Sequence, residues 1–133
     1  LLTREFNDAV KRTLAPGGVY LLTVIDVLNT GRLWPAAAHT LRRTYRHVEL
    51  VTPHADFAPD EPRVYVLYAA DAPLDVPVLR AKLAARGLPL LATHRPPFGA
   101  AEYLLEQGPK VELTEQSAPV DNLTAEVVRR KAR

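Results

Sequence analysis

A long apolar run that follows a turn predicts a central β-strand at residues 19–26. Pro16, Gly17 and Gly18 form the turn signal, and the eight residues after them, VYLLTVID, are almost continuously apolar and end on Asp26. A strand that helices cover on both faces loses the alternation of apolar and polar positions, so we predict that both faces of this strand are buried. Its carboxyl end is the edge at which open α/β sheets bind their ligands.

Residues at helical spacing predict one helix before this strand and another after it. The first helix spans residues 2–14, with Thr3 as its N-cap. The second begins near Pro35, because proline suits the first turn of a helix. Its apolar stripe consists of Trp34, Ala38, Leu41 and Tyr45, whereas Arg42, Arg43 and Arg46 face water. Both patterns are those of helices that pack one side on a core.

Two more strands are predicted at residues 47–51 and 63–70. The segment between them, PHADFAPDEP, is rich in turn-forming residues, so the two strands are expected to pair antiparallel through a hairpin-like connection. A short helix built on Val78, Leu79, Leu83 and Leu88 follows, then a helix over 98–107 and an extended segment over 111–117. Helices that alternate with apolar strands indicate an α/β fold, which we assign to a single domain over residues 1–133.

The composition narrows the classes of function. Of 133 residues, 47% are hydrophobic and 24% are charged, and no apolar stretch is long enough to cross a membrane. The lack of cysteine excludes disulfides and thiol catalysis and fits a cytoplasmic protein. The net charge is +2, but four basic residues lie within 129–133, and the 13 basic and 15 acidic residues that remain do not favour a nucleic-acid partner.

Two further features of the composition bear on function. The four histidines lack the spacing of a metal site, so no metal ligand is assigned. They are His39, His47, His54 and His94. The chain has no methionine and begins on Leu1, so we expect it to be the downstream part of a longer protein.

Three stretches of sequence resemble one superfamily of enzymes. LAPGGVYLL, at residues 14–22, is similar to a turn and strand of class I S-adenosylmethionine-dependent methyltransferases. LLTREFNDAVKRTLAPGG, at residues 1–18, resembles a segment of the spermidine synthase-like proteins of that superfamily, the polyamine aminopropyltransferases. LTEQSAPVDNL, at residues 113–123, resembles a terminal motif of the bacterial branch, although Ser117 stands where an aromatic residue is usual.

The resemblance implies the C-terminal half of a Rossmann-like methyltransferase fold. Residues 19–26, 47–51 and 63–70 would be its strands five, six and seven, with the antiparallel seventh strand inserted between the other two. The family's cofactor is S-adenosylmethionine or its decarboxylated form. The Gly-rich loop and the acidic strand end that bind this cofactor are absent here, and the family's catalytic aspartate lies just before Leu1. No catalytic residue is therefore assigned.

Four residues are predicted to bind substrate. Asp26 could pair with the ammonium group of an amine acceptor, or it could cap a loop by accepting from backbone amides. The resemblance places Asp121 and Asn122 at the rim of the active site, whereas as plain residues they are adequate helix caps. Trp34 could wall a pocket near Asp26, or it could simply belong to the core.

Two hypotheses of function follow. In the first, the chain is part of a transferase for a small amine substrate and is inactive alone, because its cofactor-binding half is missing; aminopropyl and methyl transfer are not distinguished. In the second, it is a non-catalytic interaction domain. Without the upstream strands, residues 19–26 would have an unpaired edge, which could form a homodimer or complement the missing N-terminal half.

Overall fold

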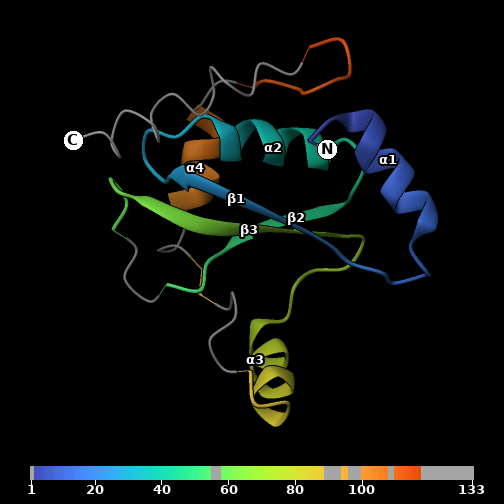
Figure 1. Ribbon diagram of the computed structural model, residues 1–133, viewed down its shortest axis with the longest axis vertical. Helices are drawn as coiled ribbons and strands as arrows, with labels where there is room; N and C mark the ends of the chain where they lie inside the picture. Colours follow the sequence, from blue (N-terminus) through green and yellow to red (C-terminus); the bar gives the residue numbers. More distant parts are fainter. Residues whose placement is uncertain (1, 55–57, 89–93, 96–99, 108–109, 118–133) are drawn as a thin grey trace.

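The fold is a three-stranded sheet with helices on both sides (Figure 1). The computed structural model describes residues 2–54, 58–88, 94–95, 100–107 and 110–117. Helices α2 and α4 lie on one side of the sheet and α3 extends from the other side, while α1 lies beside one end of α2 (Figure 1). The architecture is therefore mixed α/β, as the alternation of patterns predicts.

The sheet has the strand order β1-β3-β2, so its last strand is inserted between the other two. Its strands are β1 (Tyr20–Val27), β2 (His47–Val51) and β3 (Pro62–Ala70). Strand β3 is antiparallel to both neighbours, and β1 and β2 are therefore parallel to each other. In this register Leu67 faces Leu22 on one side and Leu50 on the other. The predicted antiparallel pairing of the second and third strands is confirmed.

Four helices are described: α1 (Arg4–Thr13), α2 (Leu33–Arg42), α3 (Val76–Ala85) and α4 (Ala100–Gln107). Thr3 caps α1 as predicted, because its hydroxyl accepts from the backbone N–H of Phe6 at 3.3 Å. Asp75 caps α3 in the same way through Val78. Gly87 follows α3 at a φ of +68°, a left-handed conformation that glycine adopts without steric cost.

The main core lies between α2 and the sheet. The predicted apolar stripe of α2 is buried, and the Trp34 side chain is only 1% exposed. The burial of α2 extends beyond that stripe, to Ala36 and Ala37. These small side chains let the helix approach the strands closely, where Tyr65 and Leu67 of β3 meet it. Arg42, Arg43 and Arg46 are exposed, as predicted.

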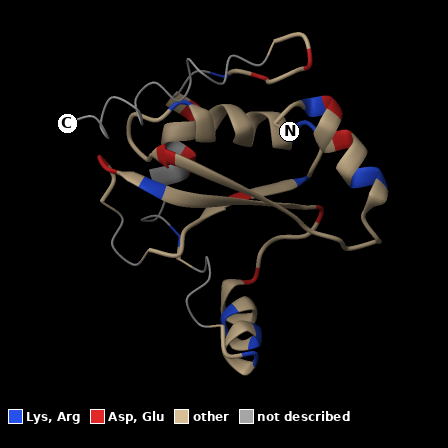
Figure 2. Cartoon of the chain, in the orientation of Figure 1, with Lys and Arg blue, Asp and Glu red and all other residues tan. Residues whose placement is uncertain are grey.

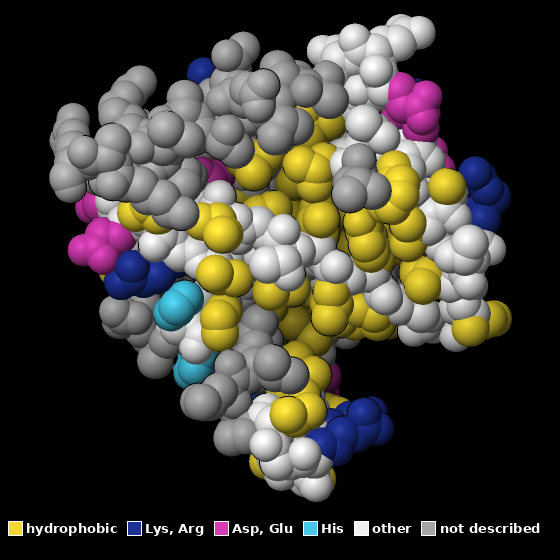
Figure 3. Space-filling model, viewed as in Figure 1, with side chains coloured by type: hydrophobic (Ala, Val, Ile, Leu, Met, Phe, Trp, Pro, Cys, Tyr) yellow, Lys and Arg dark blue, Asp and Glu magenta, His cyan; other side chains and the backbone are white. Residues whose placement is uncertain are grey.

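The prediction that both faces of the first strand are buried is wrong for the described structure. Val24 is 5% exposed on the face toward α2, but Leu21 and Ile25 on the other face are 59% and 46% exposed. The reason is that α2 and α4 lie on one side, whereas α3 covers only part of the opposite side, near β2. Apolar side chains therefore gather openly over the sheet and continue toward α3 (Figure 3).

Two further predictions on local structure need correction. Val78 and Leu88, which were expected on the apolar side of the third helix, are 47% and 48% exposed. Only the start of α3 packs on the sheet, where Leu74 and Val76 meet Val51 in a small second core. The segment after α4 does not stay extended to Ser117, because residues 114–117 close a tight turn with paired backbone hydrogen bonds.

Candidate functional site

A hollow of about 300 Å³ lies at the carboxyl end of β1, where the sequence predicts the ligand site. Its wall combines the loop after β1, the first turn of α2 and part of α4. The lining residues are Leu28, Asn29, Thr30, Gly31, Arg32, Trp34, Pro35, Leu104 and Gln107. The loop and α2 are joined directly to β1, so the end of the strand fixes the position of this wall.

Asp26 is enclosed beneath this hollow rather than open to it. The residue is 0% exposed. Its carboxylate accepts from the backbone N–H of Val27 at 2.9 Å and from that of Trp34 at 2.8 Å. The second bond satisfies one of the N–H groups that a helix leaves unpaired in its first turn. Asp26 thus ties the loop to the start of α2, and its pairing with a substrate ammonium group stays a prediction.

Gly31 seals the carboxylate from above. A Cβ atom on this residue would lie 2.2 Å from Oδ1 of Asp26 and 2.3 Å from the carbonyl oxygen of Val27. The backbone N–H of Gly31 donates to that same carbonyl at 2.7 Å. Only a residue without a side chain fits this close approach. Nothing in the local sequence around Gly31 predicts this contact.

Trp34 belongs both to the core and to the wall of the hollow. Its indole N–H donates to the carbonyl oxygen of Leu28 at 3.1 Å, which holds the ring against the loop after β1. The two readings of Trp34 that the sequence leaves open are therefore compatible. Substrate binding by this residue stays a prediction.

Two residues of β3 complete the polar surroundings of Asp26, and sequence reasoning missed both. The register places Arg63 opposite Asp26, and the acidic end of β1 lies beside the basic start of β3 (Figure 2). Tyr65 is two residues along β3 from Arg63, opposite Val24, and therefore lies on the same face of the sheet as Arg63. Its hydroxyl is buried and has no hydrogen-bond partner among the described residues. Burial raises the pKa of the Tyr65 hydroxyl; the Asp26 charge adds to this, and the Arg63 charge opposes it.

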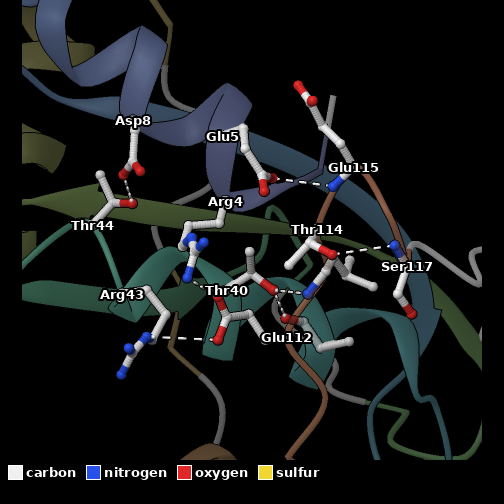
Figure 4. Close-up of polar contacts among 12 residues, drawn as sticks. Arg4, Glu5, Asp8, Thr40, Arg43, Thr44, Glu112, Thr114, Glu115 and Ser117 are labelled. Atoms are coloured by element: carbon white, nitrogen blue, oxygen red, sulfur yellow. Dashed lines mark hydrogen bonds and ion pairs between the residues drawn. The ribbon is translucent and has the colours of Figure 1, made fainter.

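The terminal motif is described only as far as Ser117, and this part is anchored to α1 and α2 (Figure 4). The backbone N–H of Leu113 donates to the Thr40 hydroxyl at 2.8 Å, and the Leu113 carbonyl accepts from the N–H of Arg4 at 2.8 Å. Glu112 lies between Arg4 and Arg43, at 2.9 and 3.6 Å (Figure 4). Asp121 and Asn122 lie outside the described residues.

Two classes of feature are absent from the described part of the chain. No group of three or more potential metal ligands occurs there. Within the same residues, no helix is long and apolar enough to span a membrane. Arg32 is the charged residue in the wall of the hollow, so this surface presents a cation and several neutral polar groups.

The fold is similar to that of a known enzyme structure. No protein-family model matches the sequence, and no curated protein matches it either. Among solved structures, the crystal structure of a probable spermidine synthase from Corynebacterium glutamicum matches with a TM-score of 0.61 at 15% sequence identity. The match covers 89% of this chain and 42% of that one, so the chain spans less than half the length of its structural neighbour. The likeness shows a related, Rossmann-like fold.

Proposed function

We propose that the chain is the C-terminal portion of a spermidine synthase-like, S-adenosylmethionine-dependent transferase. The observation that carries this proposal is the match of nearly the whole chain to under half of a probable spermidine synthase. The inserted antiparallel strand supports it as well. In this assignment β1, β2 and β3 are the fifth, sixth and seventh strands of the parent sheet, and the hollow beside Trp34 forms part of the acceptor side.

The residues that the structure describes do not fit the sulfonium cofactor. Gly31 is the glycine that follows β1, and its open side is filled by the Asp26 carboxylate, so it offers no cradle for a ligand. Gly17 lies in the turn before β1, at the opposite end of the strand. S-adenosylmethionine, or its decarboxylated form, is therefore assigned to the portion of the parent protein that this chain lacks. We assign the chain to positioning of the acceptor amine, which depends on geometry.

Calorimetric titration of the 133-residue chain tests the first half of this proposal. S-adenosylmethionine and decarboxylated S-adenosylmethionine are expected to release no saturable heat, whereas tight binding of either by this chain alone would contradict it. Binding of the acceptor amine, the second half of the proposal, is measured by fluorescence, because Trp34 is the chain's single tryptophan and lines the hollow. Putrescine or another small amine is expected to change its emission. Gln107→Ala should weaken that response, whereas Arg86→Ala, at the residue that follows α3, serves as the control.

A second candidate function is pairing through the edge of β1, and the open apolar face supports it. Strand β1 is at the edge of the sheet, and no described strand pairs with its outer side. The strand carries no proline or lysine, which commonly protect such edges, and its own residues Leu21 and Ile25 are exposed on the open face of the sheet. Such an edge is suited to a second copy or to a partner strand.

Light scattering over a range of concentrations tests this second candidate. The unmodified chain is expected to associate as its concentration rises, and Leu21→Lys should weaken the association. Leu88→Lys is the matched control, because it places the same charge on an exposed leucine beyond α3. A chain that stays monomeric at every concentration would count against pairing through β1.

A further inference from the structure

A second hollow lies at the opposite end of β1 from Asp26, beyond the end of α2. It has a volume of about 430 Å³. Four cationic side chains and one carboxylate line it: Lys11, Arg42, Arg43, Arg46 and Asp71, together with Tyr45. We call this the arginine pocket. An adjoining hollow of about 220 Å³ shares Lys11, Tyr45 and Asp71 with it and extends to the turn before β1.

The charges of the arginine pocket are only partly compensated. Lys11 pairs with Asp71 at 3.2 Å, and Arg43 pairs with Glu112 at 3.6 Å. Arg42 and Arg46 make no ion pair with any described residue. Hydrogen bonds from the Arg46 backbone N–H and from Lys11 lower the pKa of Asp71, and the Arg46 charge adds to this effect, so Asp71 offsets part of that charge. The pocket keeps an excess of positive charge, which a phosphate dianion would balance. Guanidinium groups suit this ligand because their planar N–H forks bind two oxygens at once.

Tyr45 supplies an independent sign of a missing partner. The residue is 3% exposed and lines both hollows, yet its hydroxyl forms no hydrogen bond in the described structure. An unpartnered buried hydroxyl is costly, so it marks a place where a ligand atom belongs. Burial raises the pKa of this hydroxyl, and nearby Tyr20, Asp71 and Asp8 add to the effect. The hydroxyl therefore keeps its proton and is available as a donor to an anion.

The arginines of this pocket are not needed to cap the end of α2. Cations often gather at a helix C-terminus, because its carbonyl groups carry partial negative charge. Here the carbonyls of Thr40 and Leu41 accept from the backbone N–H groups of residues 43, 44 and 45. The carbonyl of Thr44 accepts from Lys11 Nζ at 2.8 Å. These three carbonyl groups already have donors, so they do not need the guanidinium groups of Arg42 and Arg46.

From this geometry we propose that the arginine pocket binds a small phosphate monoester. Arg42 and Arg46 hold the phosphate dianion, and the Tyr45 hydroxyl donates to one of its oxygens. The rest of the ligand extends into the adjoining hollow, beside the turn at Pro16 and Gly17. This site is separate from the acceptor hollow, so it does not depend on the proposed transferase function.

Calorimetric titration with inorganic phosphate at pH 7.5 and constant ionic strength tests the proposal. We expect saturable binding that sulfate competes and chloride does not. Arg42→Gln and Arg46→Gln should each weaken it about tenfold or more, because each loses a charge-assisted hydrogen bond. Tyr45→Phe leaves the net charge unchanged and should weaken binding about fivefold. Arg86→Gln, an equal loss of charge on exposed surface next to α3, should change nothing.

Three results would overturn the proposal. The first is the absence of saturable phosphate binding by the unmodified chain. The second is an Arg86→Gln variant as weak as Arg46→Gln, which would reveal a diffuse charge effect rather than a site. The third is a chain that does not bind phosphate but binds a single-stranded oligonucleotide with a steep salt dependence. The phosphodiesters of an oligonucleotide are monoanions, so their binding does not need a site for a phosphate dianion. Arg42 and Arg46 are exposed, so their variants keep the test valid even if Tyr45→Phe unfolds the chain.

Discussion

Gly31→Ala is expected to destabilise the fold severely, because this glycine packs directly on the carboxylate that ties β1 to α2. The new Cβ would lie 2.2 Å from Oδ1 of Asp26, about 1 Å closer than any ordinary contact of this kind. The carboxylate must therefore move and lose its hydrogen bonds to the N–H groups of Val27 and Trp34. Hydrogen bonds to a charged group contribute about 1.5–3 kcal/mol each, so we expect a loss of roughly 3–5 kcal/mol.

That loss is large beside the free energy of unfolding of a typical domain, which is about 5–15 kcal/mol. For a chain of this size it corresponds to a fall in melting temperature of roughly 10–20 °C. The assay is thermal and urea unfolding followed by Trp34 fluorescence, because this ring adjoins the altered contact.

Gly17→Ala is the matched control for the backbone contribution. Gly17 has a φ of +76° and nothing within 4 Å of an added Cβ, so alanine there costs only the conformational strain, about 1–2 kcal/mol. A Gly31→Ala variant that melts within a few degrees of the unmodified chain, with unchanged Trp34 emission, would refute the reasoning. It would mean that Asp26 is open to the hollow and free to meet a ligand.

Three further changes test other parts of the structure. Asn7→Leu should raise the free energy of unfolding, measured by urea unfolding, by about 1–3 kcal/mol, because the Asn7 side-chain amide is fully buried and has no described hydrogen-bond partner. A loss of stability would show that this amide does have a hydrogen-bond partner. Thr40→Val should cost about 1–3 kcal/mol and speed hydrogen exchange at Leu113, whose N–H loses its acceptor; unchanged exchange would argue against this anchor. Burial lowers the pKa of His39, and its hydrogen bond to the Leu105 carbonyl partly opposes this effect. The unfolded chain therefore binds a proton at His39 more readily than the folded chain does. The free energy of unfolding should thus fall as the pH drops below about 6.5. His39→Gln should flatten that part of the pH profile, and an unchanged slope would assign it to other groups.

Local patterns were sufficient to predict most elements of the fold. Thr3 caps α1 as its position before an amphipathic run indicates, and the apolar stripe of α2 is buried. The turn-rich segment before β3 joins an antiparallel pair of strands. These features depend on neighbours in sequence, which periodicity and turn chemistry report directly.

Contacts that depend on tertiary packing were not predictable in this way. The apolar sequence of β1 indicates which positions favour burial, but not that helices of the described chain cover only one face of it. The closeness of Asp26 to Arg63 and Tyr65 follows from the register of an antiparallel pair that is distant in sequence. The enclosure of Asp26 also depends on Gly31, and a loop glycine gives no sign of what lies above its Cα.

The strand order also sets the order in which the sheet can assemble. Strands β2 and β3 are neighbours in sequence, so their hairpin closes a short loop, with Val51 opposite Val66. Strand β1 must find β3 over a much longer separation, with Tyr20 opposite Ala69, and it can dock only after β3 has been synthesised. On a ribosome, the apolar β1 therefore emerges before its partner strand and remains without it while the intervening residues are added. We therefore expect β1 to be the segment that is most open to pairing with other nascent chains during this interval.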